Sequence, residues 1–234
     1  MIFPSIESSP DFNDLVKNYP DVLKSLFGIE GGDITSGAGY LDVELFSLML
    51  PLLVLVLAIG SGARTLAGEE DAGRLELVLS YPVRRRDAVL EKGAAVACEI
   101  LAVCVVVFIT ILAFDALVGL DLSASKLGAA VVSLAALGLL YGWLALAVGA
   151  VIPSRALAIG IPAGAAAAAY LVNGLHGLAG WLDPFRFLSP FWLVGSSPLQ
   201  KGADAWGVFA VVLTAVVVLL AGSLLVERRD LETP

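Results

Sequence analysis

Hydrophobic positions in this chain come in long blocks that are separated by shorter polar stretches. Five blocks lie at residues 43–63, 94–118, 127–152, 156–175 and 206–226, and none has Lys or Arg in its interior. A helix needs about 20 apolar residues to cross the hydrocarbon core of a bilayer, so each block predicts a transmembrane helix. We therefore expect an all-α polytopic membrane protein whose transmembrane region covers residues 43–226.

The longest charged stretch between two blocks covers residues 64–93. Within it, Ala72, Leu75, Val78 and Leu79 recur at spacings of three and four residues, which places them on one side of a helix. Acidic residues crowd the start of this helix, where the unpaired backbone N–H groups favour negative charge. These acidic residues are Glu69, Glu70 and Asp71, and Glu76 lies with Glu69 on another side of the helix. The pattern predicts a short amphipathic helix over about residues 68–80.

A basic group follows this helix. Pro82 ends the helix because proline cannot donate the helical hydrogen bond. Arg84, Arg85 and Arg86 come next, just ahead of the second apolar block. We predict that these three arginines anchor the loop at a membrane surface.

The distribution of Lys and Arg predicts the orientation of the chain. Nine of the 14 Lys and Arg residues lie on the side that contains the 64–93 loop and the tail 227–234. The positive-inside rule places that side in the cytoplasm. Residues 1–42 then form an extracytoplasmic amphipathic segment, and residues 176–205 lie at the outer face. Such a leader is awkward to translocate alone, so we expect one more span to precede residue 1.

Composition agrees with a membrane protein and says little about partners. The chain is 59% hydrophobic and 15% charged, whereas ordinary soluble domains are roughly 25% charged. The net charge of −8 argues against nucleic acid as a ligand. It does not predict an acidic partner or an orientation, since topology responds mainly to Lys and Arg.

Glu99 and Asp115 are the ionisable residues that matter most inside the predicted spans, where charge is costly and often functional. Glu99 lies near the cytoplasmic end of its span and Asp115 near the outer end of the same span. Two interpretations are open. Each residue either sits at the membrane interface and pairs helices, or forms part of a substrate or proton path.

Several other features have a plain packing interpretation. The small-xxx-small pairs at 138/142 and 160/164 predict close helix contacts, or alternatively a dimer seam. Cys98 and Cys104 are six residues apart and predict inert core positions, and His176 has no second ligand beside it, so we expect no metal site. The aromatic residues of the 176–205 segment predict either an interfacial belt or a lid over a substrate path.

Three stretches resemble the ABC-2 type ABC transporter permease family. They are GEEDAGRLELVLSYPVRRRDAVLEK at 68–92, RFLSPFWLVGSSPL at 186–199 and GSLLVERRDL at 222–231. The resemblance implies six spans, a second permease copy or paralogue, and separate ATP-binding subunits, in a prokaryotic cell membrane with the C-terminus in the cytoplasm. This chain departs from the family in having five predicted spans, as though the first were missing.

The resemblance also implies a role for the loop helix. It would be the coupling helix, seated in a groove of the ATPase. Its apolar side would pack into the groove through Leu75, Val78 and Leu79, and its acids would pair with basic residues through Glu69, Glu70 and Glu76. No G-x-x-x-x-G-K-[ST] phosphate loop occurs in the sequence, so we expect a non-catalytic permease whose ATP and Mg²⁺ bind to the partner subunit. Export is the expected direction.

Two alternatives come from other functional classes. A noncatalytic membrane scaffold, or the energy-coupling subunit of an importer, would have the same apolar blocks. An intramembrane CAAX-type protease would use the EExxxR pattern that EEDAGR fits at 69–74. That family also needs histidines in later helices, and here the lone His176 is preceded at position four by Val172 rather than by phenylalanine.

Overall fold

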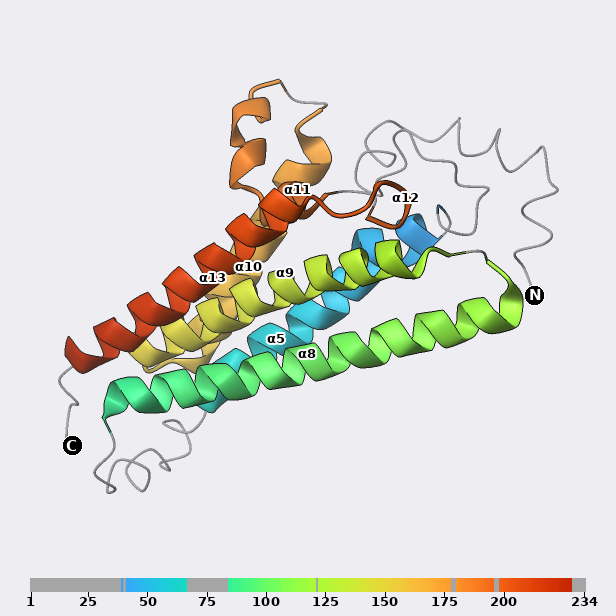
Figure 1. Cartoon of the computed structure of the whole chain (residues 1–234). Coiled ribbons are helices and arrows are strands. Elements are labelled where there is room, and N and C mark those ends of the chain that lie inside the picture. The colour runs from blue at the N-terminus through green and yellow to red at the C-terminus, as the bar shows by residue number, and fades with distance from the viewer. Residues whose placement is uncertain are drawn as a thin grey trace. The chain divides into compact units, whose positions relative to one another are not determined.

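The computed structural model describes residues 39, 41–66, 84–120, 122–177, 180–195 and 198–228. Within these ranges every regular element is a helix. Five helices in these ranges are long and apolar enough to cross a membrane. The predicted all-α class and the number of spans are therefore confirmed (Figure 1).

The spans lie close to the predicted blocks. The first is a π-helix, η1 (Asp42–Met49), that continues into α5 (Leu50–Thr65). The other four are α8 (Arg85–Val118), α9 (Ala124–Val151), α10 (Arg155–Leu175) and α13 (Ala205–Leu225). Shorter elements precede α13, namely η2 (Asp183–Leu188), α11 (Pro190–Val194) and α12 (Pro198–Lys201), and η3 (Val226–Arg228) follows it.

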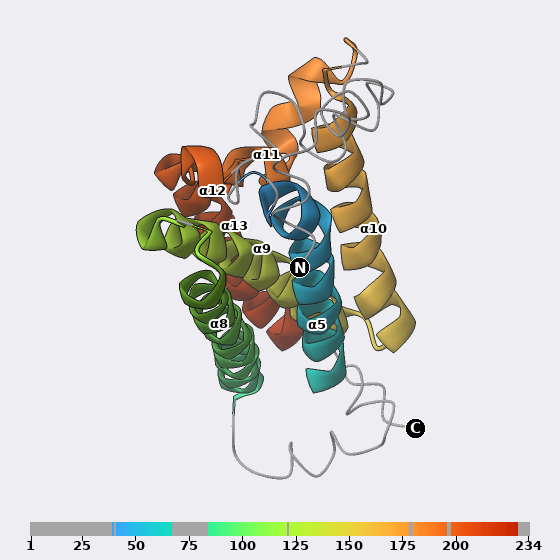
Figure 2. The same cartoon turned by 90° about the vertical axis from the view of Figure 1, so that its right-hand side faces the viewer.

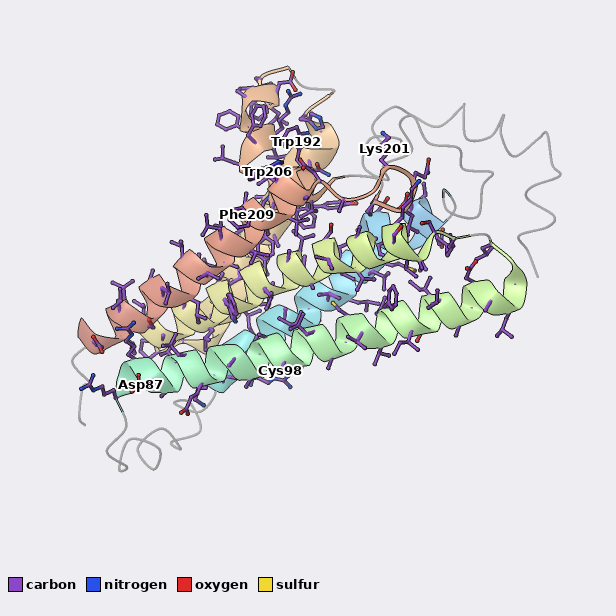
Figure 3. All side chains as sticks on the ribbon, viewed as in Figure 1. Asp87, Cys98, Trp192, Lys201, Trp206 and Phe209 are labelled. Carbon is purple, nitrogen blue, oxygen red and sulfur yellow. The ribbon has the colours of Figure 1, made fainter. Side chains whose placement is uncertain are left out.

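Helix α8 begins nine residues before the apolar block that predicted it. Its first residue is Arg85, and Asp87 projects from this first turn (Figure 3). An acidic residue there is favourable, because the first N–H groups of a helix have no helical partner. With 34 residues and about 1.5 Å per residue, α8 is longer than the hydrocarbon core of a bilayer. Its charged first turns can therefore lie outside that core.

The first span starts as a π-helix. Residues of η1 follow the π pattern up to Met49, and Pro51, which lacks an N–H group, is the second residue after it. The Ser47 hydroxyl donates a hydrogen bond of 2.8 Å to the carbonyl oxygen of Asp42. Turns of this kind occur often at functional sites, which draws attention to Asp42.

The described residues divide into two compact units. The first contains the residues up to Leu52, Cys104–Leu134 and Ala168–Val208. In it α12 lies beside η1, and α11 lies beside η2; Figure 2 shows η2 following the end of α10. The second contains Leu53–Val103, Ala135–Ala167 and the residues from Phe209 onward.

The second unit is held by small residues at helix crossings. A Cβ atom on Gly62 would lie 2.1 Å from the carbonyl oxygen of Gly142, so the backbones of α5 and α9 nearly touch. On the part of α9 that belongs to this unit, Ala145 and Leu146 are fully buried. Close backbone approach at small residues is a common way for helices to associate in lipid.

An apolar cluster in the same unit provides a test of packing. Leu219 of α13 is 8% exposed and lies with Val89 and Leu146, whereas its neighbour Leu220 is 41% exposed. We expect Leu219→Ala to lower the free energy of unfolding by about 2–4 kcal/mol, because it leaves a cavity. Leu220→Ala should cost less than about 1 kcal/mol. Thermal unfolding in detergent measures both, and equal losses would contradict the packing described here.

Candidate functional site

The predicted coupling helix lies outside the described residues, as do its six named positions, Glu69, Glu70, Leu75, Glu76, Val78 and Leu79. The structure describes the helix ends that precede and follow it in the sequence. Helix α5 ends before it at Thr65, and Arg84, Arg85 and Arg86 lie at the start of α8. Arg84 and Arg86 are exposed, as a surface anchor requires, and the anchoring role stays a prediction.

Glu99 connects the two helices that flank this loop. The Ser61 hydroxyl of α5 donates a hydrogen bond to Oε2 of Glu99 on α8. Nη2 of Arg64, one turn further along α5, lies 4.0 Å from Oε1 of the same carboxylate. Ser61 is buried, while the Arg64 and Glu99 side chains are 60% and 40% exposed. At that exposure the ion pair contributes little to stability, and the hydrogen bond to the charged oxygen contributes more.

Two further hydrogen bonds lie beside these contacts, one between α8 and α5 and one between α9 and α8. Lys92 Nζ donates to the carbonyl oxygen of Thr65 over 2.7 Å, across the two ends of the loop. Trp143 Nε1 of α9 donates to the carbonyl oxygen of Gly93 over 2.9 Å. Thr65 lies in the last turn of α5, where carbonyl groups lack helical partners and cations are favoured. Together with the Ser61, Arg64 and Glu99 contacts, these bonds form a set that we call the loop clamp.

The loop clamp bears on the two interpretations of Glu99. Both carboxylate oxygens face groups on α5, so the side chain already has partners within the protein. This arrangement favours helix pairing over a place on a transport path. It also joins α5 to α8, the helices that precede and follow residues 67–83.

Substitution of Glu99 separates these interpretations. In Glu99→Gln an amide oxygen can still accept from Ser61, so we expect stability within about 1 kcal/mol of wild type and transport within about threefold. Glu99→Ala leaves the buried Ser61 hydroxyl without its acceptor and should lower the unfolding free energy by about 1.5–3 kcal/mol. Thermal unfolding and dye transport in liposomes measure both effects. A Gln variant that folds normally but transports nothing would place the ionisable group on the path instead.

Asp115 has a local role. Its Oδ1 accepts a hydrogen bond from the backbone N–H of Leu122 over 3.2 Å, and its carbonyl oxygen accepts from Gly119 N over 2.8 Å. Gly119 has a φ of +71°, which is the left-handed turn that commonly ends a helix. Asp115 thus helps to close the turn between α8 and α9, and these bonds favour the interface interpretation over a transport path.

Sequence reasoning did not single out Asp42, which the structure places in a buried polar site. Asp42 is 2% exposed, and its two carboxylate oxygens accept from the backbone N–H groups of Leu199 and Gln200 over 3.0 and 3.1 Å. Lys126 Nζ, at the start of α9, donates to the carbonyl oxygen of Gln200 over 2.6 Å. Only the position of Asp42, as the last acidic residue before the first apolar block, could have drawn attention to it.

The aromatic segment 176–205 contains a small stacked group. The Arg186 guanidinium carbon lies 4.9 Å from the Phe187 ring centre and 5.3 Å from that of Trp192. Nη1 of Arg186 lies 3.7 Å from Oδ1 of Asp183. Trp181 and Leu188 are largely exposed. Exposed aromatic residues beside a cation fit a membrane interface, and the choice between a belt and a lid stays a prediction.

The two glycine pairs differ in their surroundings. A Cβ on Gly138 would lie 2.8 Å from Val54 Cγ1, and one on Gly142 would lie 3.2 Å from the carbonyl oxygen of Ala58. This pair therefore packs against α5, as the prediction of close helix contacts requires. A Cβ on Gly160 or Gly164 of α10 would meet no other described part of the chain within 4 Å.

Cysteine and histidine take ordinary positions. Cys98 is exposed on α8 (Figure 3), so the core position predicted for it is wrong, whereas Cys104 is buried as predicted. Both are free thiols. His176 Nδ1 lies 2.7 Å from the carbonyl oxygen of Asn173, one turn earlier. Across the described ranges, no group of three or more His, Cys, Asp or Glu side chains is placed to hold a metal ion.

Comparison with known proteins identifies the family. No curated protein and no solved structure matches the chain. The family described as "Multidrug efflux system permease Rv1217c, C-terminal domain" matches residues 8–226, which includes all five spans and the loop between α5 and α8. The chain is therefore a membrane protein that belongs to the family of the C-terminal domain of this multidrug efflux permease.

Proposed function

We propose that this chain is the membrane-spanning permease subunit of an ATP-driven ABC transporter that exports its substrates. The observation that carries the proposal is the family match over residues 8–226, because the family is described by multidrug efflux. The resemblance of residues 68–92 to the coupling loop of ABC-2 type permeases supports the ATP-driven part. ATP and Mg²⁺ would bind to a separate ATP-binding subunit, and this chain would catalyse no reaction of its own.

The loop clamp fits a role in coupling. Closure of the ATP-binding subunits around ATP would push on the helix at about residues 68–80. The loop clamp joins the ends of α5 and α8 on either side of that helix through Ser61, Glu99 and Lys92. A push on the loop would then move both flanking helices together rather than bend one against the other. That joint movement would switch access between the two faces of the membrane.

The rest of the assembly follows from the same proposal. A second permease copy or a paralogue would complete the translocation path, as the resemblance to ABC-2 type permeases implies. The protein would lie in a prokaryotic cell membrane, with the 64–93 loop and the C-terminus in the cytoplasm. Exposed apolar side chains on the spans, such as Leu53 and Val106, would then face lipid or the partner permease.

Reconstitution with the ATP-binding subunit tests the proposal. The chain, extended upstream if the reading frame continues, is co-expressed with the product of the adjacent ATPase gene and placed in liposomes. We expect the two proteins to co-purify and to show vanadate-sensitive ATP hydrolysis together with ATP-dependent movement of a hydrophobic dye. Failure to associate would contradict the ATP-driven mechanism and favour a scaffold role for the chain.

A further inference from the structure

Asp42 hydrogen-bonds to α12, a short helix that is far away in the sequence. Its carboxylate accepts from the N–H groups of Leu199 and Gln200, which are 157 and 158 residues further along the chain. Lys126 binds the carbonyl oxygen of Gln200 from a third element. A buried carboxylate is costly unless its oxygens accept hydrogen bonds, and here both do. Three parts of the first unit therefore meet at α12.

Helix α12 depends on these contacts because it is short and flanked by turns. It has four residues and begins with Pro198, which has no N–H group to donate. Gly195 before it and Gly202 after it have φ values of +93° and +82°, so the backbone turns on both sides. In the described residues, the side chains of Asp42 and Lys126 hydrogen-bond to its backbone. Lys201 projects from its end (Figure 3).

The span that contains Asp42 also contains three residues of the loop clamp, Ser61, Arg64 and Thr65. Residues Asp42–Thr65 form one candidate span. At its last turns, Ser61 binds Glu99 and the carbonyl oxygen of Thr65 accepts from Lys92. The same helical run is thus hydrogen-bonded to α8 beside the proposed coupling loop, and through Asp42 to the segment that leads into α13.

We propose that Asp42 is a positioning residue that fixes α12 to the first span, so that the outer segment before the last span moves with that span during transport. The inference rests on the proposed function, because it assumes that a push on the coupling loop displaces the first span. It predicts a specific defect. Without the Asp42 carboxylate, ATP would still be hydrolysed, but the movement would no longer reach the segment at 198–201.

Thiol labelling tests the contact on the chain alone. In a background of Cys98→Ala and Cys104→Ala, Leu199→Cys places a probe at a position that is 3% exposed, and Val89→Cys places one at a 1% exposed position in the other unit. With a water-soluble maleimide, Asp42→Ala should speed labelling at 199 at least tenfold and leave labelling at 89 within twofold. Asp42→Asn keeps one acceptor oxygen and should fall between Ala and wild type.

Transport per ATP hydrolysed tests the consequence. In the reconstituted complex we expect Asp42→Ala to keep ATP hydrolysis within threefold of wild type and to lower dye transport at least tenfold. Asp204→Asn is the matched control. Asp204 belongs to the same outer segment, and its Oδ1 accepts from Trp206 N, only two residues away, over 3.1 Å. An asparagine can make that contact, so both activities should stay unchanged.

The labelling rates and the transport per ATP test different parts of the role proposed for Asp42. Unchanged labelling at 199 in Asp42→Ala would overturn the contact, and equal acceleration at 199 and 89 would show general unfolding instead. Faster labelling at 199 with normal transport per ATP would overturn the role in transport. A wild-type complex that lacks ATP-dependent transport would overturn the proposed function and this transport role with it, while the labelling rates would still decide whether Asp42 holds α12.

Discussion

Gly62→Ala is expected to lower the free energy of unfolding by about 3 kcal/mol, which corresponds to a fall in Tm of roughly 6–12 °C. The added Cβ would lie 2.1 Å from the carbonyl oxygen of Gly142 and 3.0 Å from the Cβ of Ala145. Both neighbours are fixed parts of α9 that no side-chain rotation can move. The two helices must therefore separate, and the contacts of Gly142 with Ala58 are lost with them.

Gly60→Ala is the matched control, because it makes the same change two residues earlier in α5. A Cβ at Gly60 meets nothing within 4 Å, and alanine favours a helix by up to about 1 kcal/mol relative to glycine. We expect Gly60→Ala to leave the Tm unchanged or slightly raised. Thermal unfolding in detergent micelles, followed by size-exclusion fluorescence, compares the two. Similar Tm values for both variants would contradict the close crossing of α5 and α9.

The spans could be predicted from the sequence because lipid imposes a simple rule. An apolar block near 20 residues has few alternatives to a membrane helix, and all five blocks became helices. Outside lipid that rule does not apply. Residues 85–93 are charged or mixed, so their pattern did not show that α8 begins at Arg85. The π-helix of η1 also has no signal in the spacing of apolar residues.

Side-chain roles were harder to predict than spans. The pairs 138/142 and 160/164 look alike in the sequence, yet Gly138 and Gly142 pack against α5, while a Cβ added at Gly160 or Gly164 would meet no other described part of the chain within 4 Å. Spacing shows that two glycines share a helix face, but it does not show what that face meets. For the same reason, the sequence could raise Glu99 as a functional candidate without showing that Ser61 and Arg64 lie beside it.

Asp42 shows a further limit of sequence reasoning. Its partners are backbone N–H groups of residues 199 and 200, and any residue except proline supplies such a group. The residue types at positions 199 and 200 therefore do not predict the contact with Asp42. Only the fold brings the start of the first span to the segment before the last one.

The second large effect expected concerns function rather than folding. Leu75→Glu should abolish ATP-dependent dye transport by the complex with the ATP-binding subunit, with a fall of at least tenfold. On the predicted helix at about residues 68–80, Leu75 shares its side with Ala72, Val78 and Leu79. A glutamate there would bring a charge into an apolar groove, where an unpaired charge costs several kcal/mol. The ATP-binding subunit would then bind poorly.

Leu77→Glu is the control for this prediction. Residue 77 lies two positions after residue 75, which turns it by about 200° to the far side of the same helix. The substitution adds the same charge to the same loop, so it reproduces any general effect on expression or membrane insertion. We expect it to keep co-purification and transport within about threefold of wild type. If both variants lose the ATP-binding subunit equally, the helix does not bind through the side that carries Leu75. If both transport normally, the 68–80 segment does not couple to an ATPase at all.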